Sequence, residues 1–469
     1  MTPERLFSRR ILGMDRMSSK NKRAGEANAF HVSILGGGIA GLSAGYFAGK
    51  KGLPFTVYES KQIVGGNCLT LKHQDFLYDS GAHRFHDKDA LMTQELKNLL
   101  GEELQEIQAP SQIYYRGTYI DFPLTPLDLM LKLGLMTLSK ATFDLVKARM
   151  ARRAIPEDFE GFAVHTYGKT IAELFLLGYT RKLWGIPPNE LSPVTSGGRL
   201  KGLTISTFLH ETFGGNKRTT KHLDGSFYYP RQGIQVIPQK LAESCGNSRI
   251  LTESRISRIF HDYGRIHAIE VNGRDRIETS WVVNTFPLNL FLDLLEPRPP
   301  QEIVSLTKAL RYRDLLLIAF FLRRPSVSKN ASIYFPDPRL PFARIYEPKN
   351  RSGLMAPADK TALIVEYPCQ RNDQTWICAD SQLIDAARSH LVRIGLVKDA
   401  DILDGVVTRM EYAYPVIEKG TEERKKRIFG FLQGFENLKS SGRGALFEYI
   451  HIHDIMRISE EIMEGLALT

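Results

Sequence analysis

The stretch HVSILGGGIAGLSAGYFAGK, residues 31–50, decides the fold of this chain. Residues 31–35 predict a buried strand, the three glycines predict a tight turn, and residues 39–50, rich in alanine and leucine, predict a helix. After a turn at 52–54, residues 55–59 predict a second strand. Together these elements make a β-α-β unit, the minimal half of a doubly wound parallel sheet.

The glycines of this unit have the G-x-G-x-x-G spacing of a dinucleotide site, with Gly36, Gly38 and Gly41 at its fixed positions. Gly36 allows the tight turn, Gly38 leaves room for a pyrophosphate, and Gly41 lets the helix pack close to the sheet. The helix N-terminus offers unpaired N–H groups and a positive dipole end to the phosphates. Glu59 ends the second strand, where a carboxylate can accept hydrogen bonds from ribose hydroxyls.

The composition places the chain among globular proteins. Its 469 residues are 43% hydrophobic and 24% charged, which excludes a disordered chain. The longest clean apolar run, residues 315–322, is too short for a membrane-spanning helix, which needs about 20 residues. The net charge of +10 is compatible with an anionic small ligand or a membrane surface. No dense basic and aromatic segment stands out, so we expect no nucleic-acid partner.

Cysteine usage predicts reduced thiols and no metal centre. None of the four cysteines forms a C-x-x-C motif, and no histidine lies at zinc-ligand spacing from a cysteine pair. We therefore expect a cytoplasmic protein without a bound metal. The segment Ser8-Arg9-Arg10-Ile11 is similar to a twin-arginine export signal, but mostly polar residues follow it, so we expect 1–29 to be a disordered tail.

A second glycine pair follows the β-α-β unit. Gly65-Gly66-Asn67 lies shortly after the second strand, and the segment GAHRFH at residues 81–86 comes next. At this point the chain resembles the flavoprotein superfamily of amine oxidases, protoporphyrinogen oxidases and UDP-galactopyranose mutases. Asn67 and GAHRFH resemble the mutases in particular. The resemblance implies FAD as the cofactor, bound by the first glycine motif together with Gly65, Gly66 and Asn67.

Two further segments extend the resemblance to the flavin. Gly442-Arg443, followed by Tyr449, resembles the late FAD segment of the superfamily, which implies that Arg443 and Tyr449 contact the cofactor. His83 and His86 lie in the glycine-rich loop and are candidate catalytic residues that can face the flavin ring. A structural role is the alternative for both histidines.

The last predicted helix can also act on the flavin. Asp454 is predicted to cap it, and apolar residues recur at helical spacing over 455–468. If the segment at Gly442 lies against the flavin, the dipole of this helix and the charge of Arg443 favour the anionic reduced ring. An ordinary closing helix is the alternative, and both descriptions can hold together.

The resemblance to the mutases also implies a nucleotide-sugar site. Tyr179 and Trp184 stand in a segment similar to the one whose aromatic residues contact the nucleotide sugar, and core packing is their alternative role. Arg199 is the nearest candidate for a second mutase arginine that has no clear counterpart here. Tyr367 resembles a later substrate tyrosine.

Arg344 is a candidate catalytic and substrate-binding residue, since it stands where the mutases carry a diphosphate-binding arginine. The guanidinium geometry suits a bidentate pair with a phosphate. Glu347 lies nearby in the sequence, so an ordinary ion pair with Glu347 is the alternative.

These patterns predict an α/β fold with a discontinuous Rossmann-type FAD-binding domain and an inserted substrate domain of mixed helices and antiparallel sheet. Helices are predicted within 90–108, 127–153 and 159–213, a short β segment with a turn at Arg116-Gly117 is predicted at 114–122, and strands dominate beyond residue 224. The expected boundaries are 30–110, 225–300 and 430–469 for the FAD-binding domain, with 111–224 as the helical part and 301–429 as the sheet of the substrate domain.

The resemblance implies an FAD-dependent enzyme similar to UDP-galactopyranose mutase, which contracts the ring of a nucleotide sugar with reduced FAD and can use NAD(P)H as the external reductant. An oxidoreductase of the amine oxidase or protoporphyrinogen oxidase type is the alternative, and a non-catalytic binding scaffold is a second one. Residues 127–153 mix apolar and basic side chains, which is typical of an interfacial membrane helix or of a buried substrate-domain helix. A homo-oligomer is compatible with the sequence.

Overall fold

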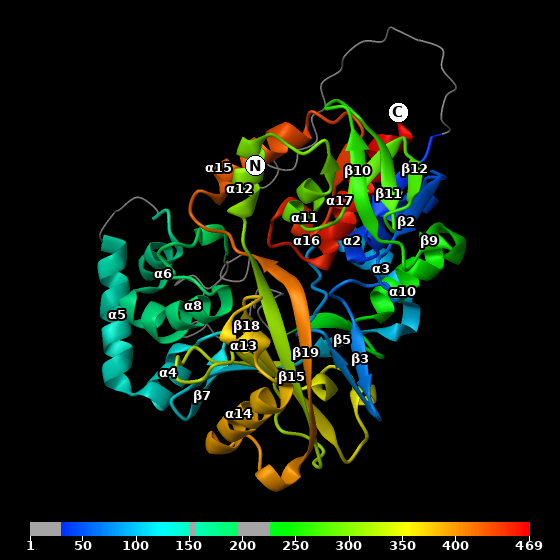
Figure 1. Ribbon diagram of the computed structural model, residues 1–469. Coiled ribbons are helices and arrows are strands. Elements are labelled where there is room, and N and C mark those ends of the chain that lie inside the picture. Colours follow the sequence, from blue (N-terminus) through cyan, green and yellow to red (C-terminus); the bar gives the residue numbers. More distant parts are fainter. Residues whose placement is uncertain (1–29, 151–155, 196–225) are drawn as a thin grey trace, which may run out of the picture.

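The computed structural model describes residues 30–150, 156–195 and 226–469 (Figure 1). The expected tail at 1–29 and the candidate substrate residue Arg199 therefore lie outside the described residues. The fold is mixed α/β, and the predicted fold class is confirmed.

A five-stranded parallel sheet forms one half of the molecule. Its order is β20–β13–β1–β2–β9, with strands Leu438–Ser440, Trp281–Asn284, Val32–Leu35, Phe55–Tyr58 and Ile250–Leu251. Val32 pairs with Phe55 on one side and with Trp281 on the other, so segments far apart in the sequence build one sheet. All four residues of β1 are buried, as expected for a central strand covered on both faces.

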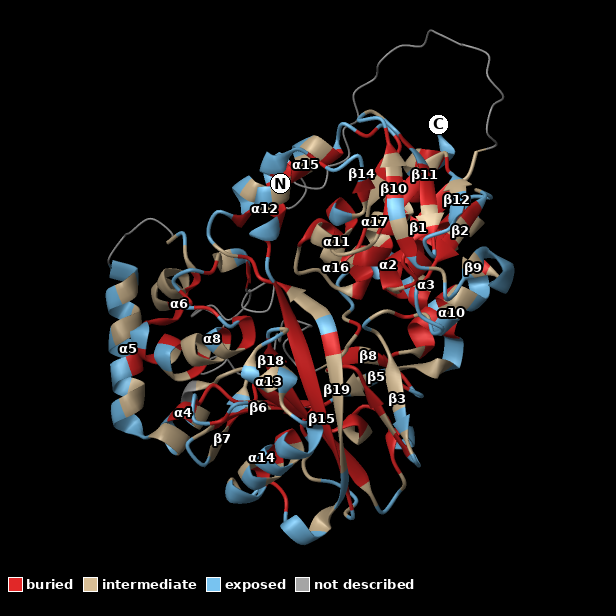
Figure 2. Cartoon of the chain, viewed as in Figure 1, coloured by how far each residue is buried: buried red, intermediate tan, exposed pale blue. Residues whose placement is uncertain are grey.

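Four helices pack around this sheet in a shared hydrophobic core (Figure 2). They are α2 (Ile39–Lys50), α3 (Ala90–Leu100), α10 (Val236–Cys245) and α17 (Ile452–Ala467). Gly45 of α2 shows why the sequence needs small residues here, because a Cβ at this position would lie 2.9 Å from the sulfur of Cys245. A smaller sheet of order β12–β11–β10–β14 lies beside them, with strands Asp275–Glu278, Ile266–Val271, Ile256–His261 and Leu295–Glu296.

A seven-stranded sheet forms the other half. Its order is β19–β15–β18–β17–β16–β6–β7, with strands Ile402–Pro415, Tyr312–Leu322, Thr361–Cys369, Arg344–Tyr346, Ser332–Tyr334, Ser111–Tyr115 and Thr118–Phe122. All eleven residues of β15 are buried, and β15 and β19 run side by side through the centre of the molecule (Figure 1). The short β segment predicted at 114–122 is confirmed as β6 and β7, but these strands join this sheet, whereas the domain boundaries assigned 111–224 to the helical part.

A group of helices packs beside β7, the strand at one edge of the seven-stranded sheet. They are α4 (Pro126–Leu133), α5 (Leu135–Met150), α6 (Phe159–Tyr167), α7 (Lys169–Ile171), a π-helical segment (Ala172–Leu177) and α8 (Gly178–Trp184). A single helix over 127–153 was expected, yet the chain breaks at Gly134, whose φ of 84° is left-handed. Glycine adopts this conformation at low cost, which explains the break.

Two further boundaries differ from expectation. The predicted helix over 90–108 ends at Leu100, and residues 104–108 form β5 (Leu104–Gln108), which pairs with β8 (Ser226–Pro230). The last helix begins at Ile452 and not at the expected cap Asp454, because the Asp454 carboxylate reaches back and accepts a hydrogen bond from the His451 N–H at 2.8 Å. His451 is therefore the N-cap residue.

The other elements connect these layers. They are β3 (Thr70–His73), β4 (Phe76–Asp79), α11 (Leu288–Asp293), α12 (Gln301–Lys308), α13 (Gln374–Ile377), α14 (Asp380–Arg393), α15 (Thr421–Leu432) and α16 (Arg443–Leu446). Within the described parts of the chain, no helix combines the length and the apolar character needed to cross a bilayer.

Candidate active site

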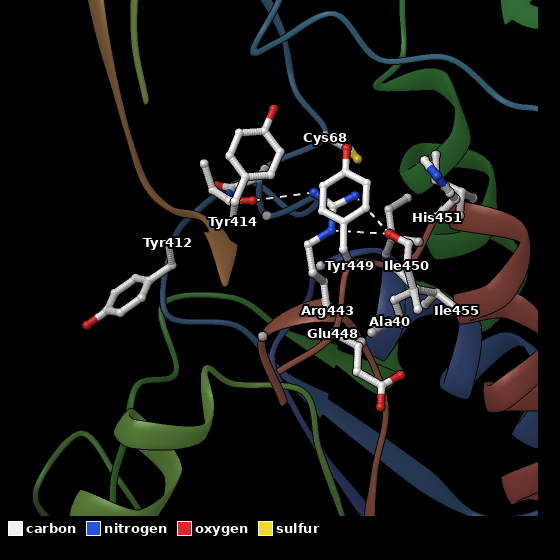
Figure 3. Close-up of a pocket in the computed structure, with 18 of the residues that line it drawn as sticks. Ala40, Cys68, Tyr412, Tyr414, Arg443, Glu448, Tyr449, Ile450, His451 and Ile455 are labelled. Atoms are coloured by element: carbon white, nitrogen blue, oxygen red, sulfur yellow. Dashed lines mark hydrogen bonds between the residues drawn. The ribbon is translucent and has the colours of Figure 1, made fainter. Parts of the chain in front are cut away.

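A cavity of about 2080 Å³ lies at the carboxyl ends of the parallel strands and extends along β19 (Figure 3). Sites for one small ligand measure roughly 300–1,000 Å³, so this cavity has room for a dinucleotide and a substrate together. Most of the predicted site residues line it, namely Gly36, Gly38, Glu59, Gly65, Gly66, Asn67, His83, His86, Tyr179, Arg344, Arg443 and Tyr449. Gly41, Trp184 and Tyr367 do not line it.

The glycine turn leaves a cradle that fits a pyrophosphate. Gly36 has a φ of 106°, and a Cβ there would lie 2.5 Å from the hydroxyl of Thr285. At Gly38 the nearest protein atom to a Cβ is the Cα of Gly66 at 3.7 Å, so the protein itself does not require this glycine. The N-terminus of α2 has no side-chain cap, which leaves its first N–H groups for an anionic ligand. These observations fit FAD.

Gly41 supports the turn from behind. It does not line the cavity, although we expected it to bind the cofactor. A Cβ at Gly41 would lie 1.8 Å from the carbonyl oxygen of Gly36, far inside any allowed contact. Gly41 is therefore required by the close approach of helix and turn, and its effect on a cofactor is indirect.

Glu59 holds the end of β2 and still faces the cavity. One carboxylate oxygen accepts a hydrogen bond from the Gly37 N–H at 2.8 Å, and the other accepts one from the Lys61 N–H at 2.8 Å. A carboxylate offers about four acceptor positions, so capacity for ribose hydroxyls remains. This arrangement fits the predicted role of Glu59.

Arg443 ties the end of β19 to the start of α17. Its guanidinium donates to the carbonyl oxygen of Ile450 at 2.8 Å and to that of Ala413 at 3.3 Å (Figure 3). It also lies 4.9 Å from the ring centre of Tyr449 and 5.6 Å from that of Tyr414. Arg443 thus places a positive charge in the cavity wall and fixes two aromatic neighbours.

Aromatic side chains form much of the wall beyond Arg443. The ring of Tyr179 lies 5.6 Å from that of Tyr334 in an edge-to-face arrangement. Trp184 is buried behind the wall, with its ring 6.0 Å from both Tyr414 and Tyr449. The structure therefore gives Tyr179 access to a ligand and gives Trp184 the alternative role, core packing that supports the wall.

Arg344 forms a buried bidentate ion pair, but with Glu366 and not with Glu347. Its Nε donates to one Glu366 oxygen at 2.7 Å and an Nη donates to the other at 2.9 Å. Burial lowers the pKa of Arg344, but the Glu366 carboxylate outweighs it and holds that pKa well above the usual value. Glu347 instead accepts hydrogen bonds from the Val327 N–H and from the hydroxyl of Thr361. The charge of Arg344 is thus already neutralised by a protein carboxylate.

Tyr367 lies on the opposite face of β18 from Glu366, because neighbouring residues of a strand point to opposite faces. Its side chain belongs to the core beneath the sheet, with its ring 5.8 Å from that of Phe342. Burial raises the pKa of the Tyr367 hydroxyl. The structure therefore does not bring Tyr367 to the cavity, and the expected substrate contact is not supported.

His83 places a neutral ring in the cavity wall. Burial lowers its pKa to about 3, and the nearby charges of Arg443, Arg351 and Arg344 act in the same direction. Its Nε2 is buried and has no hydrogen-bond partner among the described residues. His86, in the same loop, also lines the cavity, with its ring 5.9 Å from that of His451. His83 is therefore equipped to accept a hydrogen bond from a ligand while remaining neutral.

The pKa of His83 predicts how stability depends on pH. Below about pH 6.5 the unfolded chain binds a proton at this histidine, whereas the folded chain does so only near pH 3. The free energy of unfolding should thus be highest above pH 6.5 and fall by about 1.4 kcal/mol per pH unit below it from this residue. Denaturant unfolding of His83→Gln at several pH values should show that its free energy of unfolding decreases less steeply with falling pH than that of the parent. The exposed His267→Gln is the control, and equal slopes for His83→Gln and the parent would contradict the prediction.

Several wall residues were not predicted from the sequence. They are Tyr334, Arg409, Tyr412, Tyr414 and His451, which come from β16, β19 and the segment before α17. Tyr412 and Tyr414 stand at the end of β19, where a β-bulge and a positive φ at Tyr412 interrupt the strand alternation, so no simple pattern in the sequence places both rings in the wall. The described residues contain no group of three or more histidine, cysteine, aspartate or glutamate side chains arranged to hold a metal ion.

Comparisons with known proteins identify relatives of this chain. The family model for flavin containing amine oxidoreductases matches residues 39–415. Protoporphyrinogen oxidase 1 of Spinacia oleracea is 25% identical over 302 residues, which are 59% of this chain and 53% of that protein. Coproporphyrinogen III oxidase of Bacillus subtilis is 24% identical over 305 residues, 57% of this chain and 62% of that protein. The chain thus matches between half and two thirds of the length of these relatives.

Solved structures share the fold over most of the chain. A reduced UDP-galactopyranose mutase superposes with a TM-score of 0.82 at 19% identity, covering 94% of this chain and 96% of that one. A putative protoporphyrinogen oxidase from Exiguobacterium superposes with a TM-score of 0.75 at 16% identity, covering 94% and 99%. The superfamily expected from the sequence is confirmed, whereas its mutase branch is not. This chain belongs to the family of flavin containing amine oxidoreductases.

Proposed function

We propose that this chain is an FAD-dependent oxidoreductase that removes a hydride from a substrate whose buried part carries no net charge. The observation that supports this choice is the ion pair of Arg344 and Glu366. The sequence relatives that match half of the chain or more are oxidases, which agrees with the choice.

The ion pair argues against an anionic group deep in the cavity. A phosphate at Arg344 would have to displace Glu366 or lie beside its negative charge, and both cost free energy in a buried site. The neighbouring wall is mostly apolar or aromatic, built by Ile113, Phe122, Phe175, Leu176, Leu315 and Tyr334. Such a wall favours an uncharged, largely apolar substrate.

The chain itself would bind the cofactor, position the substrate and accept a hydrogen bond from it. The N-terminus of α2 would hold the pyrophosphate and Glu59 the ribose of FAD, and Arg443 would supply a positive charge in the same cavity. Bound FAD supplies the acceptor for the hydride. Oxidation of a C–H bond next to an N–H or O–H group also releases a proton, which passes to solvent, while the unpartnered Nε2 of neutral His83 can accept a hydrogen bond from that N–H or O–H group.

A ring-contracting mutase acting on a nucleotide sugar is the second candidate. Its support is the fold likeness to a UDP-galactopyranose mutase over 94% of the chain, together with Tyr179 and Tyr449, whose side chains line the cavity. Such an enzyme needs reduced FAD, with NAD(P)H as an external reductant. A diphosphate would then bind elsewhere than at the paired Arg344 or in competition with Glu366.

The two candidates differ in redox demand, which an anaerobic experiment measures directly. The proposed oxidoreductase starts with oxidised flavin and bleaches one flavin per substrate until an oxidant is admitted. Porphyrinogens and amines are suitable first substrates to add to the oxidised protein, with flavin absorbance as the readout. We expect stoichiometric bleaching by one of these classes, and no reaction of UDP-galactopyranose with the dithionite-reduced protein.

The opposite result would replace the proposal with the second candidate. Many turnovers of a nucleotide sugar per reduced flavin, with none on oxidised flavin, would show a mutase. Flavin-loaded protein that binds but never converts either class would favour the scaffold. These outcomes can be distinguished from a simple loss of cofactor, because flavin content is measured in the same sample.

A further inference from the structure

We propose that the outer face of α4 and α5 is a docking surface for a membrane that contains anionic lipids. This docking face consists of the exposed apolar residues Leu127, Leu131, Leu135, Met136, Phe143, Val146 and Met150 together with the exposed basic residues Lys140, Lys147 and Arg149. None of these residues lines the cavity, so membrane docking and turnover can be measured separately.

The apolar side chains of this face are exposed to an unusual degree. Their exposed fractions run from 51% for Val146 to 87% for Met136, and only Ala141 of the sixteen residues in α5 is buried. α5 stands at the outer edge of the molecule and is coloured mainly as exposed and intermediate (Figure 2). Single exposed apolar residues are ordinary, but a contiguous group of this kind marks an interaction surface.

The inner side of α5 is firmly packed, so its outer face is fixed in orientation. The Asp144 carboxylate accepts hydrogen bonds from the N–H of Thr170 at 3.0 Å and from its hydroxyl at 2.6 Å. Gly168 allows a close approach on the same side, since a Cβ there would lie 2.9 Å from the backbone nitrogen of Leu145. The apolar outer side chains therefore cannot be buried by a simple rotation of the helix.

The charges of the docking face select a lipid surface over a second copy of this chain. Asp144 is the sole acidic residue of α5 and is used inward, while Lys140, Lys147 and Arg149 point outward among the apolar side chains. A two-fold contact would bring this positive face against itself, at a cost in repulsion. An anionic bilayer can bind both the apolar and the basic side chains of the docking face. The apolar side chains enter the interface, and the cations contact the lipid head groups.

Vesicle flotation of the full flavin-loaded chain tests the docking face. Wild-type protein should float with phosphatidylcholine vesicles that contain phosphatidylglycerol, and it should bind pure phosphatidylcholine vesicles far less. The double variant Met136→Ser/Phe143→Ser should weaken binding by at least about tenfold, because two apolar side chains no longer enter the interface. The double variant Lys140→Glu/Lys147→Glu should weaken binding by about fivefold or more for each lysine.

Matched variants outside the docking face separate this effect from a general loss of surface hydrophobicity. Leu354 and Ile377 are each 61% exposed and lie elsewhere, so Leu354→Ser/Ile377→Ser should bind vesicles as the wild type does. Flavin content must be equal in all variants, which shows that they are folded. Equal flotation of the Met136→Ser/Phe143→Ser variant and the wild type would overturn the proposal. A second result would also overturn it. In that result the wild type is a dimer by light scattering, the Met136→Ser/Phe143→Ser variant is a monomer, and neither protein binds either kind of vesicle.

Discussion

Gly38→Val is expected to weaken flavin binding sharply while leaving the protein folded. A Cβ at this position meets only the Cα of Gly66 at 3.7 Å, so the apoprotein can accept a side chain there. The side chain would then occupy the cradle that faces the N-terminus of α2, where a pyrophosphate must lie. Overpacking of this kind costs about 1–3 kcal/mol or more, which weakens cofactor affinity by roughly 5- to 150-fold. Flavin absorbance of the purified variant measures cofactor binding, and circular dichroism measures folding.

A neighbouring glycine provides the contrast. Gly41→Ala puts a Cβ 1.8 Å from the carbonyl oxygen of Gly36, so this smaller change should disrupt the turn and reduce the yield of folded protein. The pair of variants separates a glycine needed by the ligand from one needed by the fold. If Gly38→Val retained a full complement of FAD, the assignment of the cradle to the pyrophosphate would be wrong.

Glu366→Leu is expected to lower the free energy of unfolding by about 3–5 kcal/mol, because it leaves the buried charge of Arg344 without a partner. It also removes the acceptor for the Ala82 N–H, which lies 3.0 Å from Glu366 and joins the His83 loop to β18. Denaturant unfolding of the purified protein is the measurement. The double variant Arg344→Met/Glu366→Leu should recover most of the loss, since buried ion pairs can often be replaced by apolar side chains.

An exposed ion pair serves as the control for this prediction. Arg388 and Asp399 form a similar bidentate pair on the surface. Asp399→Leu should leave the unfolding curve nearly unchanged, because water already screens the charges of an exposed pair. A Glu366→Leu variant as stable as the parent would show that Arg344 finds another partner or becomes hydrated, and the argument for an uncharged substrate would lose its main support.

The cofactor end of the cavity could be predicted from the sequence because its chemistry is local. Gly36, Gly38 and Glu59 stand within one β-α-β unit, whose hydrophobic pattern and glycine spacing leave few alternatives. The backbone conformation is almost determined by residue type at such positions. Gly36 shows this well, since its φ of 106° is favourable for glycine alone.

The substrate end could not be predicted in the same way, because its contacts depend on strand register. Arg344 pairs with Glu366 because β17 and β18 place these residues directly opposite each other, whereas the sequence offered the nearby Glu347. The face that Tyr367 takes follows from the same register. Trp184 joins Tyr449 across a distance of more than two hundred residues in the chain, and no local pattern contains that information.

The strand order of the parallel sheet affects how the chain folds as it is synthesised. The ribosome releases β1 and β2 early, but β13, the other neighbour of β1, emerges only after residue 284, and β20 later still. Until then one edge of β1 has no partner, and the face of α2 that α17 covers is open to solvent. An unpaired strand edge and exposed apolar surface favour aggregation of the nascent chain. The parallel sheet is therefore complete only after residue 440 has left the ribosome.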